Sequence, residues 1–266
     1  MQLLGFLSAI LIGVTLGLMG GGGSILTVPI LVYLLDVAPV SATAYSLFIV
    51  GLTSLIGSVT YMRKGLVNFK AAVFFSIPAF ITVYLTRRFI IPAIPDMIFQ
   101  IDGWIMTKDI LVMAAFSLLM ISAAYSMIKK RKEHGEADDY HAEFNLPYMA
   151  IIGVTVGALS GFVGAGGGFL IIPALVIFAK LPMKTAIGTS LLIIAINSLI
   201  GFLGDLNVRT IVWLFLFKFI IFTTAGIILG GYISRFITGA KLKPAFGWFV
   251  LSMGFLILIN EFIIGG

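Results

Sequence analysis

Long apolar stretches, separated by short polar or glycine-rich interruptions, run along the whole chain. Three of them, Ser41–Met62, Ile110–Ile128 and Ile211–Ile233, exceed the roughly 18 apolar residues that a helix needs to cross a bilayer. The pattern predicts an all-α integral membrane protein with five helical elements in each half of the chain. These elements span about 3–19, 24–35, 41–62, 69–91 and 109–128 in the first half, and about 147–163, 168–179, 185–204, 210–235 and 243–262 in the second.

The second element of each half is too short to span a bilayer. It has only about 12 residues, which is a length of about 18 Å against a hydrocarbon core of about 30 Å. Glycine-rich runs, Gly20–Gly23 and Gly164–Gly168, separate it from the element before it. Glycine lowers helix propensity by about 1 kcal/mol per residue and permits a positive φ, so these runs should break a helix. Each half is therefore expected to begin with a re-entrant hairpin of two partial helices.

The two halves are related to each other in sequence. When the chain is aligned with itself at an offset of 144 residues, 16 of the 41 pairs between 17–57 and 161–201 are identical, including Pro29/Pro173. Internal duplication is common among secondary transporters. It divides the chain into an N-terminal transmembrane repeat (1–128), a charged cytoplasmic linker (129–146) and a C-terminal transmembrane repeat (147–266).

The positive charges favour opposite orientations for the two repeats. One hairpin and three crossings per repeat make an odd number of crossings, so the second repeat is expected to be inverted relative to the first. With the linker inside, 12 of the 17 Lys and Arg residues fall inside, Lys218 lies within a span, and four fall outside: Arg87, Arg88, Lys108 and Arg209. This bias follows the positive-inside rule and predicts a multi-pass protein of the cell (inner, cytoplasmic) membrane. Residues 92–108 are expected to form an interfacial segment on the outside.

Composition narrows the classes of function. Hydrophobic residues make up 60% of the chain and charged residues 11%, whereas about a quarter of a soluble domain is charged. The net charge of +6 is therefore attributed to membrane topology rather than to nucleic-acid binding. The chain has no cysteine, which excludes disulfides and thiolate sites, and neither a metal nor a cofactor is expected. Residues 3–20 are expected to be retained rather than cleaved, because Met1-Gln2 gives a signal peptide no positive flank.

The two glycine breaks are the strongest candidates for a ligand site. A partial helix begins after each break, and its first amides carry the positive end of the helix dipole. Two such ends meeting near the middle of the membrane would form a site for an anion. The residues expected there are Gly22, Gly23, Ser24, Gly166, Gly167 and Gly168. Single glycine pairs such as Gly13/Gly17 and Gly153/Gly157 are better interpreted as sites of close helix packing.

Polar side chains on the third element of each half are further candidates. Ser46 and Thr53 lie seven residues apart, as do Ser190 and Asn197, so each pair shares a helix face. These side chains suit hydrogen bonds to a substrate and hydrogen bonds between helices equally well.

Lys218 is the only formal charge that the pattern places well inside a span. An intramembrane cation would complement an anion or carry a coupling proton. The alternative is that its long stem extends along the lipid toward the headgroups. No Asp or Glu lies deep in a predicted span, since Asp205 falls near a helix end, and this favours an anion over a cation as the ligand.

The glycine motif is present twice, as GLMGGGGSILTVP at 17–29 and as GFVGAGGGFLIIP at 161–173, and AIGTSL follows at 186–191. This doubled motif resembles the signature of the TauE/SafE sulfite exporter family. The resemblance covers nearly the whole chain apart from 92–108 and 129–146. It implies transport of sulfite, another sulfur oxyanion or an organosulfonate such as sulfoacetate, and the family name suggests export. Ser24 stands where the second copy has Gly168, so the two half-sites need not bind equally.

Together these observations predict a secondary transporter that binds a small anion between the two glycine breaks. Its expected partners are the anion, the lipid bilayer and a coupling proton or other ion, while the oligomeric state is left open. An anion channel or a ligand-binding membrane sensor of the same fold is the alternative, because the same amides would serve either. An enzyme is not expected, because the sequence places no Ser/His pair or His/Glu cluster at membrane depth.

Overall fold

The structure is a computed structural model of the chain. It describes residues 2–101, 104–128, 146–164, 167–177, 179, 181–206, 211–234 and 239–260. All but the last residue of the expected linker, and the candidate ligand residue Gly166, lie outside the described residues.

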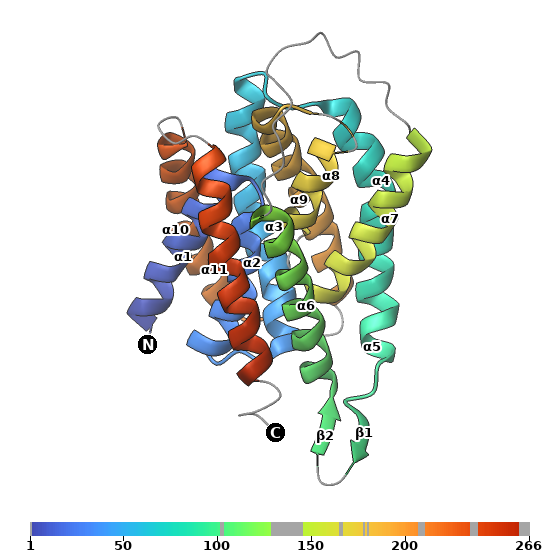
Figure 1. The fold of residues 1–266 in the computed structure, drawn as a ribbon. Coiled ribbons are helices and arrows are strands. Elements are labelled where there is room, and N and C mark those ends of the chain that lie inside the picture. Colours follow the sequence, from blue (N-terminus) through green and yellow to red (C-terminus); the bar gives the residue numbers. More distant parts are fainter. Residues whose placement is uncertain are drawn as a thin grey trace.

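Helices occupy the positions that the apolar pattern predicts, which confirms the all-α assignment for these segments (Figure 1). The first half contains α1 (Gln2–Met19), α2 (Gly22–Pro29), the π-helix η1 (Ile30–Leu34), α3 (Pro39–Arg63), α4 (Phe69–Leu85), the π-helix η2 (Thr86–Ile90), α5 (Ile91–Ala93) and α6 (Lys108–Ile128). The second half contains α7 (Leu146–Val163), α8 (Gly168–Ile177), α9 (Met183–Asp205), α10 (Trp213–Ile233) and α11 (Gly239–Ile259). The sequence did not predict the antiparallel hairpin of β1 (Met97–Ile101) and β2 (Trp104–Thr107), which precedes α6.

Both glycine runs interrupt the helical chain, as expected. Gly20 ends α1 with a φ of +68°, and Gly164 ends α7 with a φ of +73°. Their amides still donate to the preceding turn, Gly20 to the Leu16 carbonyl at 2.7 Å and Gly164 to the Ser160 carbonyl at 2.8 Å. Because other residues are strained at a positive φ, glycine lets each helix end abruptly before the next one begins.

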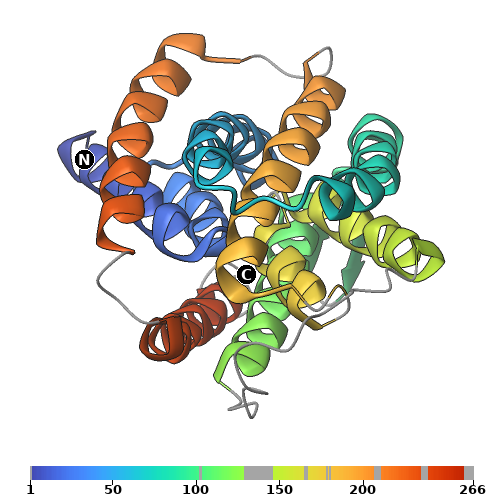
Figure 2. The same cartoon turned by 90° about the horizontal axis from the view of Figure 1, so that it is seen from above.

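The two halves are interleaved rather than packed as separate bodies. Helix α1 lies against α10, and α4 lies against α7, while α3 packs on α9 and α6 on α11 (Figures 1 and 2). Glycines permit the closest of these approaches. A Cβ on Gly17 would lie 2.5 Å from the Ile227 carbonyl oxygen, and one on Gly161 would lie 3.1 Å from the carbonyl oxygen of Val83, which is offset from Ile227 by 144 residues.

Other glycines on α1 and α7 make similar backbone contacts. A Cβ on Gly13 would lie 2.7 Å from the Ile227 amide nitrogen, and one on Gly153 would lie 2.8 Å from the Phe75 carbonyl oxygen. The close-packing interpretation of the Gly13/Gly17 and Gly153/Gly157 pairs is therefore confirmed.

Helices α3 and α9, which are equivalent in the sequence repeat, run antiparallel. Midway along α3, a Cβ on Gly51 would meet Leu199, and beyond the end of α3 the Asn68 amide donates to the hydroxyl of Thr189 at 2.9 Å. Near the start of α3, Thr43 lies close to the C-terminal end of α9 through the side chain of Arg87. This antiparallel pair passes through the middle of the molecule and carries most of the polar candidates.

Among the described residues, four helices are long and apolar enough to cross a membrane: Pro39–Arg63, Phe69–Ala93, Lys184–Asp205 and Trp213–Ile233. The helices α4 and α10 also expose large apolar side chains, which a water-soluble surface does not gather in such bands. These side chains include Phe74, Ile77 and Ile81 on α4, and Leu214, Phe217, Ile221 and Ile228 on α10.

Candidate functional site

The N-termini of the two short helices, α2 and α8, meet inside the protein. A Cβ on Gly21 would collide with the carbonyl oxygen of Gly168, and a Cβ on Gly168 would lie 2.6 Å from the Gly21 Cα. The two backbones are thus in direct contact, and only glycine allows this approach. The structure brings together the two helix ends that the sequence predicted as a ligand site, and each carries the partial positive charge of a helix N-terminus.

The glycine-run candidates differ in what surrounds them. Gly22 opens α2, whereas Gly23 packs on α1, because its Cβ would lie 2.6 Å from the Leu16 side chain. Ser24 is fully buried, and its hydroxyl donates to the Gly21 carbonyl at 2.7 Å. Gly167 has a φ of +69°, which favours glycine, and its Cβ would lie 3.0 Å from Ser160.

Helix α9 passes directly beside the two breaks. The Ser190 hydroxyl is 3.1 Å from the Gly20 carbonyl and 2.8 Å from the Ile187 carbonyl, and it donates to them. One turn further along, the side chain of Ile194 lies 2.6 Å from the position of a Cβ on Gly168. Asn197 follows three residues later, so helical periodicity places it on the same face.

Asn197 is 1% exposed, and neither its amide nitrogen nor its amide oxygen has a hydrogen-bond partner among the described residues. The buried hydroxyls of Ser46 and Ser54 on α3, and of Ser198 on α9, are in the same situation. Buried polar groups are nearly always hydrogen-bonded, so such a group needs an explanation, for which a water or a ligand is the usual one. We call the breaks and the polar candidates on the α9 face beside them the paired-break site, which comprises Gly21, Gly22, Gly23, Ser24, Gly167, Gly168, Ser190 and Asn197.

Thr53 differs from its repeat equivalent Asn197. Its hydroxyl lies 2.7 Å from that of Thr223 on α10, and both side chains are fully buried. Thr53 therefore joins two helices through a hydrogen bond, which is the structural one of the two interpretations that the sequence left open.

Lys218 is not brought together with the other candidates. It is exposed on α10, as are its neighbours Leu214 and Phe217. This placement matches the alternative in which the lysine stem extends along lipid.

Sequence reasoning missed a buried ion pair. Arg87 in η2 is fully buried, and its Nη1 lies 3.3 Å from Oδ2 of Asp205 at the end of α9, which is 1% exposed. The same nitrogen donates to the Thr43 hydroxyl at 3.0 Å. From the sequence, Arg87 was counted among the charges on the outer side of the membrane and Asp205 as a charge near a helix end, and the two were not paired. Two features of the sequence could have indicated this ion pair: a positive charge inside the predicted 69–91 span, and a negative charge at the end of the 185–204 span.

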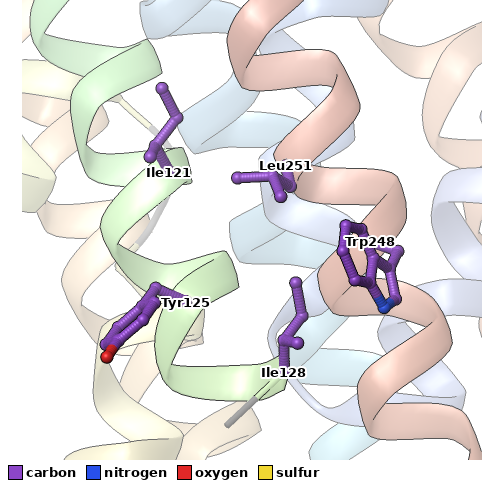
Figure 3. A pocket seen from close by; sticks show the side chains of 5 residues that line it. All are labelled: Ile121, Tyr125, Ile128, Trp248 and Leu251. Carbon is purple, nitrogen blue, oxygen red and sulfur yellow. The ribbon is translucent and has the colours of Figure 1, made fainter.

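A separate cavity of about 340 Å³ lies between α6 and α11. It is lined by Ile121, Tyr125, Ile128, Trp248 and Leu251, and Figure 3 shows these side chains on two facing helices. The described residues of its lining offer no positive charge and no helix N-terminus to an anion. Among the described residues, no group of three His, Cys, Asp or Glu side chains is placed to hold a metal ion.

A membrane protein built almost entirely of helices, with broken helices meeting inside it, has an architecture that recurs among membrane transporters. Comparison with known proteins agrees. The family described as "Sulfite exporter TauE/SafE" matches residues 5–260, and the chain belongs to this family.

Curated relatives bear the names of transporters. A "Probable membrane transporter protein" of Xylella fastidiosa is 29% identical over 252 residues, which cover 93% of this chain and 91% of the relative. The "Probable membrane transporter protein YunE" of Bacillus subtilis is 28% identical over 240 residues, 85% of this chain and 86% of the relative. MJ0441 of Methanocaldococcus jannaschii, with the same description, is 29% identical over 205 residues, 75% and 70% of the two chains. No solved structure matches the chain.

Proposed function

We propose that the protein is a secondary transporter of a small sulfur-containing anion, such as sulfite, another sulfur oxyanion or an organosulfonate, and that the paired-break site binds this anion. The observation that carries the proposal is the contact between the N-termini of α2 and α8. Asn197, on the face of α9 that passes beside this contact, is a buried amide without a hydrogen-bond partner among the described residues. Helix N-termini supply amide donors and positive potential to an anion. Asn197 would supply a further donor. The class of substrate comes from the family, whose description names sulfite export.

Binding at this site requires a change of conformation. Gly21 and Gly168 touch, so an anion can lie between the two helix ends only after α2 and α8 separate. Broken helices that open and close around a central site are a recurrent device of alternating access. We therefore propose that the described conformation is one in which the two helix ends are closed against each other.

The proposed topology is a pair of inverted repeats, each with a re-entrant hairpin and three crossings. The antiparallel course of the repeat-equivalent helices α3 and α9 supports it, because inversion about an axis in the membrane plane produces such a pair. The hydrogen bond from Asn68 to Thr189 also puts the end of α3, with Arg63 and Lys64, at the same end of the molecule as the start of α9 with Lys184. This grouping fits a cytoplasmic location for that end in the cell membrane.

Thermal unfolding of the purified protein tests the proposal against sulfite, thiosulfate, sulfate, sulfoacetate, taurine, acetate and chloride. A ligand at 100 times its dissociation constant stabilises the folded state by about 2.7 kcal/mol. We expect stabilisation by sulfur anions only. No stabilisation by any anion would remove the proposed substrate class and leave the membrane transporter without an assigned ligand.

The Asn197→Leu variant tests the site itself. It removes a buried amide whose desolvation costs about 1–3 kcal/mol, so the variant should be at least as stable as the wild type without ligand. It should nevertheless lose the stabilisation by anions. Ser117→Ala is the matched control, because this buried hydroxyl on α6 donates only to its own helix, at the Ala114 carbonyl. An Asn197→Leu variant that keeps the full anion response would show that Asn197 does not contact the ligand.

A further inference from the structure

We propose that Arg87 binds the transported anion and that Asp205 is an internal competitor, which occupies the guanidinium while the site is empty. This inference rests on the proposed transport function and adds to it a second binding group, which neither the glycine motif nor the helix ends contain. The guanidinium would be exchanged between two anions, the carboxylate of Asp205 and the substrate.

The position of Arg87 in the fold supports a role in binding the anion. Its guanidinium is fully buried, donates to Thr43 and pairs with Asp205. It also touches the second glycine break, because a Cβ on Gly164 would collide with Nη2 of Arg87. The arginine therefore lies against the wall of the turn that leads into α8.

The local backbone is arranged for this contact. Arg87 lies in η2, a π-helical turn, and such turns occur frequently at functional sites. On the other side, Gly164 combines a positive φ with direct contact to both Arg87 and Thr43, so no side chain separates the guanidinium from the backbone of the break.

The fold itself does not require the ion pair. Contacts in the two halves repeat at the offset of 144 residues: Gly164 meets Thr43, and Gly20 meets Ile187. At this offset, Arg87 corresponds to Gly231 and Asp205 corresponds to Tyr61.

The repeat-related positions hold no such ion pair. A Cβ on Gly231 would meet nothing within 4 Å. Tyr61 donates its hydroxyl to the Gly17 carbonyl at 3.2 Å, and the Lys64 ammonium lies 5.4 Å from its ring centroid. A glycine and a tyrosine thus stand where the ion pair stands in the related set of contacts. Since a buried ion pair is weak evidence for stability, its presence at only one of the two repeat-related positions points to a role in function.

The chemistry of the guanidinium also supports a role in binding an anion. A guanidinium is permanently charged, and its planar fork of N–H donors matches two oxygens of a carboxylate or of a tetrahedral oxyanion. Sulfite and sulfonates carry three such oxygens, and sulfate carries four. Asp205 presents the same chemistry from within the chain, so an entering anion competes with it for Arg87.

Competition predicts opposite effects for the two partners. Asp205→Asn keeps the shape of the side chain but removes the competing charge, so the half-saturating concentration of sulfite or sulfoacetate in thermal-shift titrations should fall at least about fivefold, a typical size for coupling between two ligands. If the ion pair is purely structural, Asp205→Asn should lower the stability and leave the affinity for the anion unchanged or weaker. An unchanged or a weaker affinity would therefore overturn the inference.

A neutral double variant keeps the test valid if Asp205→Asn does not fold. Arg87→Gln combined with Asp205→Asn removes both charges together, which leaves no unpaired buried ion. We expect this variant to fold and to lose at least about tenfold in apparent affinity for the same anions. Wild-type affinity in the double variant would refute the role of Arg87, whereas a wild-type protein that responds to no anion would refute the proposed function itself.

Discussion

The glycine at position 164 offers a sharp test of how the second break is built. Gly164 and Gly65 both follow a helix, α7 and α3 respectively, and both have a positive φ, +73° and +67°. Around Gly65 a Cβ would meet nothing within 4 Å, whereas at Gly164 it would collide with Arg87 and Thr43. The two alanine variants therefore share the backbone strain and differ in the steric contact.

The expected costs follow from these contacts. Left-handed backbone costs a non-glycine residue about 1–2 kcal/mol, which is the whole expected effect of Gly65→Ala. Gly164→Ala adds an overpacking cost of about 1–3 kcal/mol, because its Cβ would also collide with the Thr43 carbonyl oxygen and the Arg87 guanidinium would have to move aside. Gly164→Ala should therefore destabilise the protein by about 2–5 kcal/mol, more than Gly65→Ala.

Unfolding in mixed micelles titrated with a denaturing detergent, followed by tryptophan fluorescence, would measure both variants. The extra cost of Gly164→Ala should shrink in the Arg87→Gln/Asp205→Asn background, because glutamine is shorter than arginine and leaves more room beside the break. Equal destabilisation by the two alanine substitutions in the wild-type background would refute the described contact between Arg87 and the break.

Two further substitutions test the packing between halves. Gly230→Ala should destabilise the protein by about 1–3 kcal/mol, because its Cβ would collide with the Val14 carbonyl on α1. Its neighbour Gly231 has open space instead, so Gly231→Ala should be neutral or stabilising by up to about 1 kcal/mol in the same unfolding assay, and the reverse order would contradict the α1–α10 contact. Thr53→Val should cost only about 0.6 kcal/mol through loss of the hydrogen bond to Thr223, and it should leave the anion response intact, as thermal shift would show. A Thr53→Val variant without an anion response would instead make Thr53 a substrate contact.

The helices and their breaks could be predicted because they depend on local chemistry. Apolar runs, the glycine runs at 20–23 and 164–168, and the 144-residue repeat are visible without any knowledge of packing. The meeting of Gly21 with Gly168 was also within reach, since duplicated breaks in the membrane must be buried against protein or line a cavity.

The partners of individual side chains could not be predicted from the pattern. Arg87 was counted with the charges on the outer side of the membrane, and nothing in the pattern indicated that the fold buries it against Asp205, which is distant in sequence. Lys218 was placed near the substrate because it lies in the middle of a span, but hydropathy does not say which face of a helix points outward. The hairpin of β1 and β2 was missed because its short strands, among apolar residues, carry no distinct period.

The central claim is that the protein carries a small sulfur anion across the membrane by alternating access. Counterflow in proteoliposomes tests it most directly: vesicles loaded with unlabelled sulfite or sulfoacetate are diluted into a trace of the labelled anion. The account predicts transient accumulation of label above equilibrium in wild-type vesicles, and little or none with Asn197→Leu. Uptake that never exceeds equilibrium would indicate a channel, and no uptake of any sulfur anion would contradict the proposed substrate.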